Sequence, residues 1–352
     1  MSFASKAEEN EAMLAVLTKP ATFEGFLIDV EATIPDVSSP TQVVDVTDSD
    51  TDGDNHDTAM VIAQGPLDKM SVEILVHIIS QLDLKTLMKL RSVNHYLKQI
   101  VDHSILPLRQ VIKHAPNTLI AIFRTGMASH LTVSDVVEAM YSQTCVICGG
   151  FGPALHLLTC KRCCLKCLAT HPDFAPLAKI VAKSRYGLDK NTLQNLPVLK
   201  TLPGKYSFYK NVYKRRFNLV DERAACDAGI KLHGSREDME LFVGKNMSST
   251  WRDGGSNWSS REHCARRFAT ATLMPAVNKE TKIAELGVRC PSCLHFGVRT
   301  TDLAYESYTT KEGLKHVKSC LWARFEWVLH LKEKEAFQEA AKEAAKEIAG
   351  AA

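Results

Sequence analysis

Cysteines are the residues of this chain whose type and spacing could do chemistry. The chain has 352 residues and eleven cysteines, and six of these lie within the twenty-three positions from 145 to 167. Cys145 and Cys148 form one C-x2-C pair, which Gly149 and Gly150 follow. Two such pairs can clamp a tetrahedral zinc ion through four thiolates, so this segment predicts a structural zinc site.

The residues alone leave the second pair of this site open. Cys160 and Cys163 have the C-x2-C spacing, and Cys164 and Cys167 have it too. The alternative to a metal site is a set of small buried side chains, which so many cysteines in one short segment disfavour. His156 stands alone and is expected to be a packing or surface residue.

A second constellation lies nearer the carboxyl end. Cys290 and Cys293 form a C-x2-C pair, and His316 and Cys320 complete the spacing C-x2-C-x22-H-x3-C. Because His316 and Cys320 are four residues apart, they share one face of a helix and can reach the same ion. We therefore expect a second structural zinc.

The composition is that of a soluble globular protein. Hydrophobic residues make up 45% of the chain and charged residues 24%, and the net charge of +3 is too small to indicate a nucleic-acid or membrane partner. No apolar run approaches about 18 residues, and the first residues, MSFASKAEEN, lack the apolar core of a signal peptide. We expect a cytoplasmic or nuclear protein, in which clustered cysteines bind metal more often than they form disulfides.

The elements that position these sites begin with a predicted group of three short helices over residues 66–106. Ser71, Asp83 and Ser92 precede the three helical patterns. The apolar residues of the first helix fall on two stripes, Leu75 with Ile79 and Ile74 with Ile78. A helix of fewer than three turns with two apolar stripes needs two partners, one inside the protein and one outside it. The segment therefore predicts a docking module.

This segment resembles an F-box, the motif that docks substrate receptors onto the Skp adaptor of cullin-type ubiquitin ligases. The resemblance is carried by Leu67, Glu73, Ile74, Leu75, Ile78, Leu82, Leu84, Leu87, Leu90, Arg91, Val93, Asn94 and Leu97. Met70 and Ser71 stand where the family usually has Leu-Pro. Methionine can fill a leucine pocket and serine can cap the helix. The match over the whole motif favours an F-box over an ordinary helical hairpin. It implies that the main adaptor contacts include Leu67, Ile74, Ile78, Leu84, Leu87 and Leu90.

The cysteine clusters resemble those of zinc-hook F-box proteins of filamentous fungi. The stretch KRCCLKCL is similar to the zinc-binding segment that follows the F-box in that family, and this similarity selects Cys164 and Cys167 as the second pair. A C-x2-C pair followed by a helix with H-x3-C and then aromatic residues, as in LWARFEW, is similar as well. The implied cofactor is structural zinc, two ions, with the ligands Cys145, Cys148, Cys164, Cys167 and Cys290, Cys293, His316, Cys320.

Two further stretches are candidate recognition surfaces. Basic and aromatic residues alternate from Tyr206 to Phe217, a pattern that could bind nucleic acid. The balanced charge favours a half-buried element whose aromatic rings face the core. The polar loop from Asn246 to Ser260 contains Trp251 and Trp258, and an exposed tryptophan commonly anchors an interface. The alternative is that both rings fold back onto the domain.

The expected fold is mainly α with irregular zinc-stabilised loops. An N-terminal F-box of three helices would precede a C-terminal region of short helices and strands that bound zinc holds together. The expected order is a mostly disordered acidic region (1–65) with one helical pattern from Ala7 to Leu17, the F-box (66–106), a helical segment with the first hook cluster (107–175), a substrate-recognition region (176–289), the second zinc site (290–320) and a C-terminal helix (321–352).

The predicted function is that of a non-catalytic subunit. The chain has no Walker-type glycine loop, no G-x-S-x-G and no H-E-x-x-H, and the hooks do not form the eight-ligand array of a RING domain. We expect a substrate-receptor subunit of a Skp–cullin–F-box ubiquitin ligase, with the Skp adaptor, a cullin and an unknown protein substrate as partners. The alternative is a zinc-dependent nucleic-acid-binding regulator.

Overall fold

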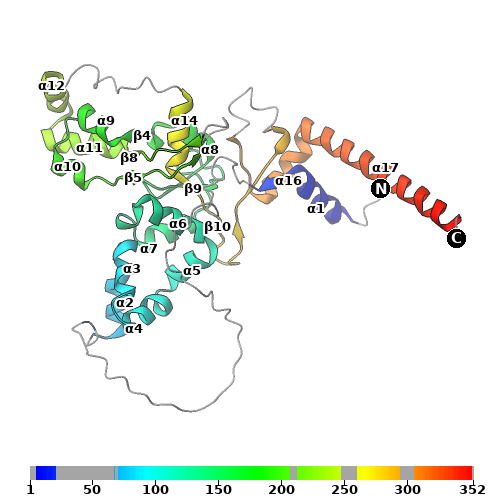
Figure 1. The fold of residues 1–352 in the computed structure, drawn as a ribbon, viewed down its shortest axis with the longest axis horizontal. Helices are drawn as coiled ribbons and strands as arrows, with labels where there is room; N and C mark the ends of the chain where they lie inside the picture. The colour runs from blue at the N-terminus through cyan, green and yellow to red at the C-terminus, as the bar shows by residue number, and fades with distance from the viewer. Residues whose placement is uncertain are drawn as a thin grey trace, which may run out of the picture.

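A computed structural model describes residues 5–20, 67, 70–206, 212–246, 260–293 and 305–350. These residues form a mainly helical protein with small antiparallel sheets, as expected (Figure 1). Three regions are visible: the helices α2–α7, a central region that contains the small sheets, and α1 beside α16 and α17. The acidic tract from Asp45 to Asp57 and the loop tryptophans Trp251 and Trp258 lie outside the described residues.

The predicted F-box segment folds into short helices. They are α2 (Val72–Ser80), α3 (Leu84–Arg91), α4 (His95–Gln99) and a π-helical turn (Ile100–Ser104). Asp83 caps α3 by accepting a hydrogen bond from the Thr86 amide at 2.9 Å. Asn94 caps α4, because its side chain accepts from the Leu97 amide at 2.8 Å. Ser71 precedes α2 without a side-chain capping bond.

A second group of helices continues directly from the first. It comprises α5 (Leu106–His114), α6 (Pro116–Thr125), a 3-10 turn (Met127–Ser129) and α7 (Val133–Tyr141). Leu75 and Ile79 of α2 share one hydrophobic core with Ile122 of α6 and Val136 of α7. Packing therefore continues across the boundary expected at residue 106.

The central region consists of small sheets and helices. Its sheets have the orders β3-β2-β9, β4-β8-β5, β10-β11 and β6-β7, and β1 pairs with β12; all pairs are antiparallel. The strands are β2 (Ala154–His156), β3 (Lys161–Cys163), β4 (Pro176–Ala178), β5 (Leu199–Lys200), β6 (Gly204–Lys205), β7 (Val212–Tyr213), β8 (Asn218–Asp221), β9 (Ala271–Leu273), β10 (Ala276–Val277), β11 (Ala284–Glu285), β1 (Lys19–Pro20) and β12 (Val288–Arg289). The helices are α8 (Leu165–Thr170), α9 (Lys179–Arg185), α10 (Lys190–Asn195), α11 (Glu222–His233), α12 (Arg236–Asn246) and α14 (Ser260–Ala269), with a 3-10 turn at Pro172–Phe174. Buried residues of this region form two hydrophobic clusters, one that includes Phe174 and Phe268 and one that includes Leu177 and Val220.

The two ends of the chain meet in a third region. It contains α1 (Lys6–Leu17), α16 (Thr310–Ser319) and α17 (Leu321–Gly350). Met13 and Leu17 of α1 are buried against Val317 of α16 and Trp327 of α17. The helical pattern predicted from Ala7 to Leu17 is present as α1, and α1 and β1 pack onto the carboxyl-terminal region. Among the described residues, none of the helices combines the length and the hydrophobicity that a membrane span requires.

Candidate metal centres and adaptor surface

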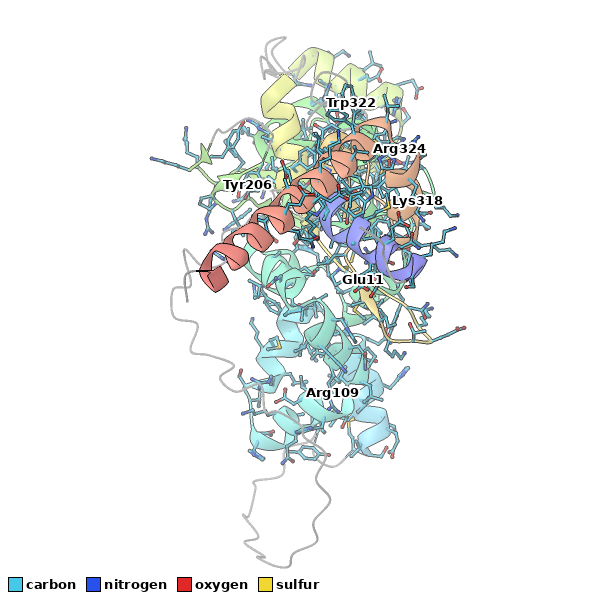
Figure 2. All side chains as sticks on the ribbon, turned by 90° about the vertical axis from the view of Figure 1, so that its right-hand side faces the viewer. Glu11, Arg109, Tyr206, Lys318, Trp322 and Arg324 are labelled. Carbon is cyan, nitrogen blue, oxygen red and sulfur yellow. The ribbon has the colours of Figure 1, made fainter. Side chains whose placement is uncertain are left out.

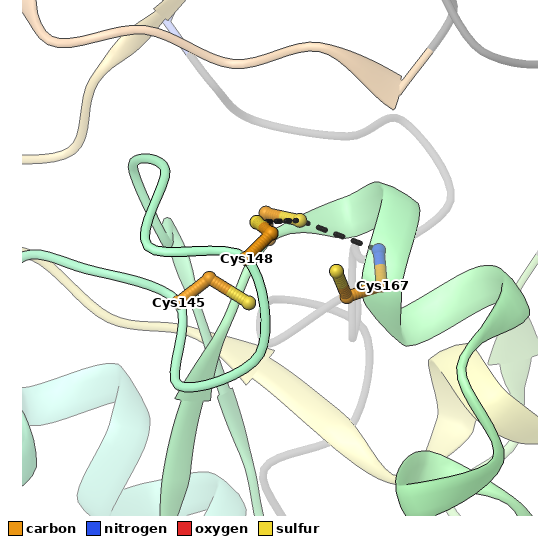
Figure 3. A group of neighbouring side chains, drawn as sticks. Cys145, Cys148 and Cys167 are labelled. Atoms are coloured by element: carbon orange, nitrogen blue, oxygen red, sulfur yellow. Dashed lines mark hydrogen bonds between the residues drawn. The ribbon is translucent and has the colours of Figure 1, made fainter.

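The first predicted cysteine pair lies on a tight loop before β2. The Cys145 amide donates to the Gly150 carbonyl at 2.7 Å, and the Gly149 amide donates to the Cys145 carbonyl at 2.9 Å. Gly149 has a φ of 72°, a left-handed conformation that glycine adopts without strain. This loop turns the Cys145 and Cys148 side chains towards the same point (Figure 3).

The other pair comes from the junction of β3 and α8. Cys164 is the N-cap residue of α8, and its sulfur accepts a hydrogen bond from the Cys167 amide at 3.3 Å. The ligand atoms of Cys145, Cys148, Cys164 and Cys167 all lie within 4.8 Å of one another. The structure thus brings together the four residues selected by the fungal resemblance.

Cys160 and Cys163 do not belong to this cluster. Cys163 is fully buried in β3, and burial raises the pKa of Cys160 to about 12. Cys160 packs against the core of the helical region, at the edge of the first hydrophobic cluster. The described geometry therefore groups Cys164 and Cys167, rather than Cys160 and Cys163, with the first pair.

The second cluster is built from a loop and one helix. Cys290 and Cys293 follow β12, while His316 lies on α16 and Cys320 is the C-cap residue of that helix. All four ligand atoms lie within 4.8 Å of one another. The Cys293 sulfur is 3.3 Å from His316 Nε2 and 3.6 Å from the Cys320 sulfur. The ring of Tyr308 stacks on His316 at a centroid separation of 4.6 Å and fixes its plane.

The donor sets and their spacing fit zinc. In a tetrahedral site with Zn–S bonds near 2.3 Å, two sulfurs are about 3.8 Å apart. The Cys148 and Cys164 sulfurs, like those of Cys293 and Cys320, are 3.6 Å apart. Four protein ligands leave no open position for a substrate, which is typical of structural rather than catalytic zinc. Either cluster could hold one such ion.

In each cluster the pKa of one thiol is lowered, while the hydrogen bond to that group raises the pKa of its partner, Cys164 or Cys293. A hydrogen bond from the Cys164 thiol lowers the pKa of Cys145 to about 4. A hydrogen bond from the Cys293 thiol, together with one from His316, lowers the pKa of Cys290 to about 3. A divalent cation at the centre would stabilise the remaining thiols as thiolates as well.

A buried arginine, which sequence reasoning missed, connects the first cluster to its surroundings. Arg162 of β3 is almost fully buried, and its guanidinium donates four hydrogen bonds to backbone carbonyls. The acceptors are Ala139 of α7 at 2.9 Å, Gly152 at 2.7 Å, Met274 at 2.8 Å and Pro275 at 2.8 Å. In the sequence, Arg162 stands between two cysteines of the motif. Its hydrogen bonds could not be predicted there, because the four carbonyls belong to segments that are distant in the sequence.

Part of the predicted adaptor surface is exposed. Leu67, Ile74 and Ile78 have exposed fractions of 40%, 54% and 43%. On the neighbouring stripe of α2, Leu75 and Ile79 are buried in the first hydrophobic core. The two apolar stripes of this helix thus have the expected arrangement, one packed inside and one facing outwards.

Two other residues of the predicted adaptor surface are not accessible. Leu84 and Leu87 are 1% and 0% exposed. They lie at i and i+3 of α3, on the face that packs into the protein's own core. Their contact with the adaptor stays a prediction. Leu90 is partly buried and packs against the same core.

The basic and aromatic stretch is partly buried. Tyr206 is buried, and its hydroxyl donates to the Leu202 carbonyl. The Arg266 guanidinium covers the ring of Phe217 at 4.7 Å. These contacts agree with the half-buried alternative. Residues 207–211 lie outside the described chain. His156 is a buried packing residue, as expected, and its ring contacts Phe174.

Comparison with known families identifies one domain. The family model for the F-box domain matches residues 67–109. The chain contains an F-box domain. This domain indicates binding to the Skp adaptor and a receptor role in a ubiquitin ligase. No curated protein and no solved structure matches the chain.

Proposed function

We propose that this protein is the substrate-receptor subunit of a Skp–cullin–F-box ubiquitin ligase. The observation that carries the proposal is the exposed stripe of Leu67, Ile74 and Ile78 within the F-box match. Water-exposed apolar side chains on a short helix gain free energy when a partner covers them, about 1.5–3 kcal/mol for each fully buried side chain. The Skp adaptor is the partner that an F-box implies.

Catalysis in this proposal is indirect. The receptor holds its target close to a charged ubiquitin-conjugating enzyme that another subunit binds. This raises the effective concentration of the target lysine at the reactive thioester and requires no catalytic residue in this chain. We propose that the target-facing surface lies beyond residue 107, with residues 176–289 as the candidate region from sequence, and that the complex acts in the cytoplasm or nucleus.

We also propose that two structural zinc ions stabilise the regions beyond the F-box. Cys145, Cys148, Cys164 and Cys167 would hold one ion, and Cys290, Cys293, His316 and Cys320 the other. Bound zinc would cross-link segments that are distant in the sequence. The two hook patterns support placing this chain among the zinc-hook F-box proteins of filamentous fungi.

The proposal is tested by affinity purification of the full chain followed by mass spectrometry. Wild-type protein should recover adaptor and cullin peptides, whereas an Ile78→Asp variant should recover neither. Ile112→Asp is a matched control, because Ile112 is also exposed but lies on α5 outside the F-box match. Recovery of nucleic acid in place of adaptor and cullin would instead support the zinc-dependent regulator.

A further inference from the structure

The C-terminal helix α17 carries apolar residues on two opposite faces. Ala323 and Trp327 are buried in the hydrophobic cluster formed with α1 and α16. Leu321, Phe325 and Val328 have exposed fractions of 73%, 60% and 49%. With 3.6 residues per turn these three share one face, which points away from Ala323 and Trp327. One face of α17 is therefore packed, and the other remains open in the described structure.

The open face forms one wall of a groove, here called the α1–α17 groove. Its other wall is formed by α1 and the end of α16, and its volume is about 790 Å³. Lys6 and Glu9 of α1, Lys318 of α16 and Arg324 of α17 line it together with the apolar residues. Figure 2 shows Lys318, Trp322 and Arg324 near the junction of α16 and α17. The groove thus combines an apolar floor with charged edges.

The charged edge is mainly cationic. Lys6, Lys318 and Arg324 outnumber the single carboxylate, Glu9. None of the three cations forms an ion pair with another described residue, and Lys318 Nζ donates to the Asn10 side-chain oxygen at 2.5 Å. A ligand that covers the apolar floor would meet these charges at its edges, so carboxylates there would strengthen binding and lysines would weaken it.

We infer that the α1–α17 groove docks an amphipathic helix of a partner protein, with apolar residues on one face and Asp or Glu beside them. The stretch from Leu321 to Val328 covers about 10 Å of helix axis, or two turns. A partner helix matches such a surface with apolar residues at i, i+3 or i+4, and i+7. The identification of this partner as the target of the ligase rests on the proposed function. The inference that the groove binds an acidic amphipathic helix does not depend on that function.

Charge argues against a second copy as the occupant. Two copies that met face to face through this groove would bring the same cations, Lys318 and Arg324, close to one another around a two-fold axis. Juxtaposed like charges oppose association. An acidic partner neutralises the same edge.

The test is a selection of helical peptides from a displayed library against the full-length protein. The library keeps an apolar face and varies the flanking positions among Asp, Glu, Lys, Arg and Ser. Enriched peptides should carry net negative charge. A synthetic peptide of the enriched sequence should bind at least about tenfold more weakly to Phe325→Ser than to wild type, measured by fluorescence anisotropy. Phe337→Ser is the control, because Phe337 is also an exposed phenylalanine of α17, with an exposed fraction of 77%, but does not line the groove.

Charge reversal provides an independent measurement. The double variant Lys318→Glu with Arg324→Glu should lose the acidic peptide and enrich basic ones instead. Enrichment of basic or uncharged peptides on wild type, or equal binding to Phe325→Ser, would overturn the inference. So would a wild-type dimer in light scattering that Phe325→Ser converts to a monomer, since the occupant would then be a second copy.

Adaptor binding separates this inference from the proposed function. Phe325→Ser should keep the adaptor and lose the acidic peptide, whereas Ile78→Asp should lose the adaptor and keep the peptide. If wild type bound the adaptor but no acidic peptide, only the groove assignment would fail. If it bound the peptide but no adaptor, the ligase role would fail and the docking surface would stand.

Discussion

Replacing Arg162 with methionine should loosen three segments of the protein together. Methionine keeps an apolar side chain of similar length but donates no hydrogen bond. Of the four carbonyl acceptors, those of Ala139, Gly152 and Met274 belong to buried residues and would lose their partner. Each buried carbonyl left unpaired costs about 2 kcal/mol, or about 6 kcal/mol for the three.

Part of this cost is offset because the variant no longer buries a charge. Burial lowers the pKa of Arg162 from 12.5 to about 10. At about 1.4 kcal/mol per pKa unit, this shift corresponds to about 3 kcal/mol of unfavourable desolvation. The expected net destabilisation is therefore about 3 kcal/mol. Arg162→Lys would keep the charge without the planar set of donors, so it should not restore stability.

Hydrogen exchange measured by mass spectrometry gives the local free energy of opening. In Arg162→Met, exchange should accelerate about a hundredfold in the loop before β2, at the end of α7 and around Met274, because about 1.4 kcal/mol corresponds to a factor of ten. Lys161→Met is the control, since Lys161 is the exposed neighbour on the same strand. If Arg162→Met exchanged at the control's rate in all three segments, the linking role of Arg162 would be refuted.

Three further variants test other parts of the structure. Cys148→Ser should reduce the zinc content by one ion per chain in elemental analysis, whereas Cys160→Ser should retain both ions; the reverse pattern would show that the ligands are misassigned. Leu87→Asp should unfold the F-box helices, seen as lost circular dichroism, because it places a charge in the core, and a folded variant would contradict that burial. Burial lowers the pKa of His156 to about 3 in the folded protein, whereas the same side chain has a pKa near 6.5 in the unfolded chain. Because the unfolded chain therefore takes up the proton at a higher pH, the stability of the fold decreases as the pH falls below about 6.5. Between pH 7 and 5.5 this costs about 1 kcal/mol in denaturant titrations, and His156→Phe should remove that slope; an unchanged slope would count against the neutral buried ring.

Local patterns were sufficient to predict the F-box helices, the helix near the amino terminus and the C-terminal helix, and to single out the two groups of cysteines. The two stripes of α2 follow from residue spacing within one helix, and His316 and Cys320 share a face for the same reason. The choice of Cys164 and Cys167 came from a resemblance, because spacing alone fits two pairs. The structure distinguishes the two candidate pairs. The turn from β3 into α8 directs Cys164 towards Cys145 and Cys148, while Cys163 lies within the strand.

Features that depend on distant partners were not predictable from local patterns. The sequence pattern predicts the helix α1. The packing of this helix depends on Val317 and Trp327, which lie some three hundred residues away in the sequence. Leu84 and Leu87 look like surface leucines in a motif, yet their environment is set by the helices that follow the F-box. Arg162 resembles any basic residue until its four acceptors converge around it.

Titration of the purified full chain with the Skp adaptor is the most direct test of the central claim, that α2 presents its outer stripe to the adaptor. Burying a new carboxylate at Ile74 or Ile78 removes about 1.5–3 kcal/mol of apolar contact and adds a desolvation cost, so each Asp variant should bind at least about tenfold more weakly by calorimetry. Ile112→Asp should bind like wild type. If Ile74→Asp and Ile78→Asp both kept wild-type circular dichroism and wild-type affinity, the assignment of this stripe as the adaptor surface would be contradicted.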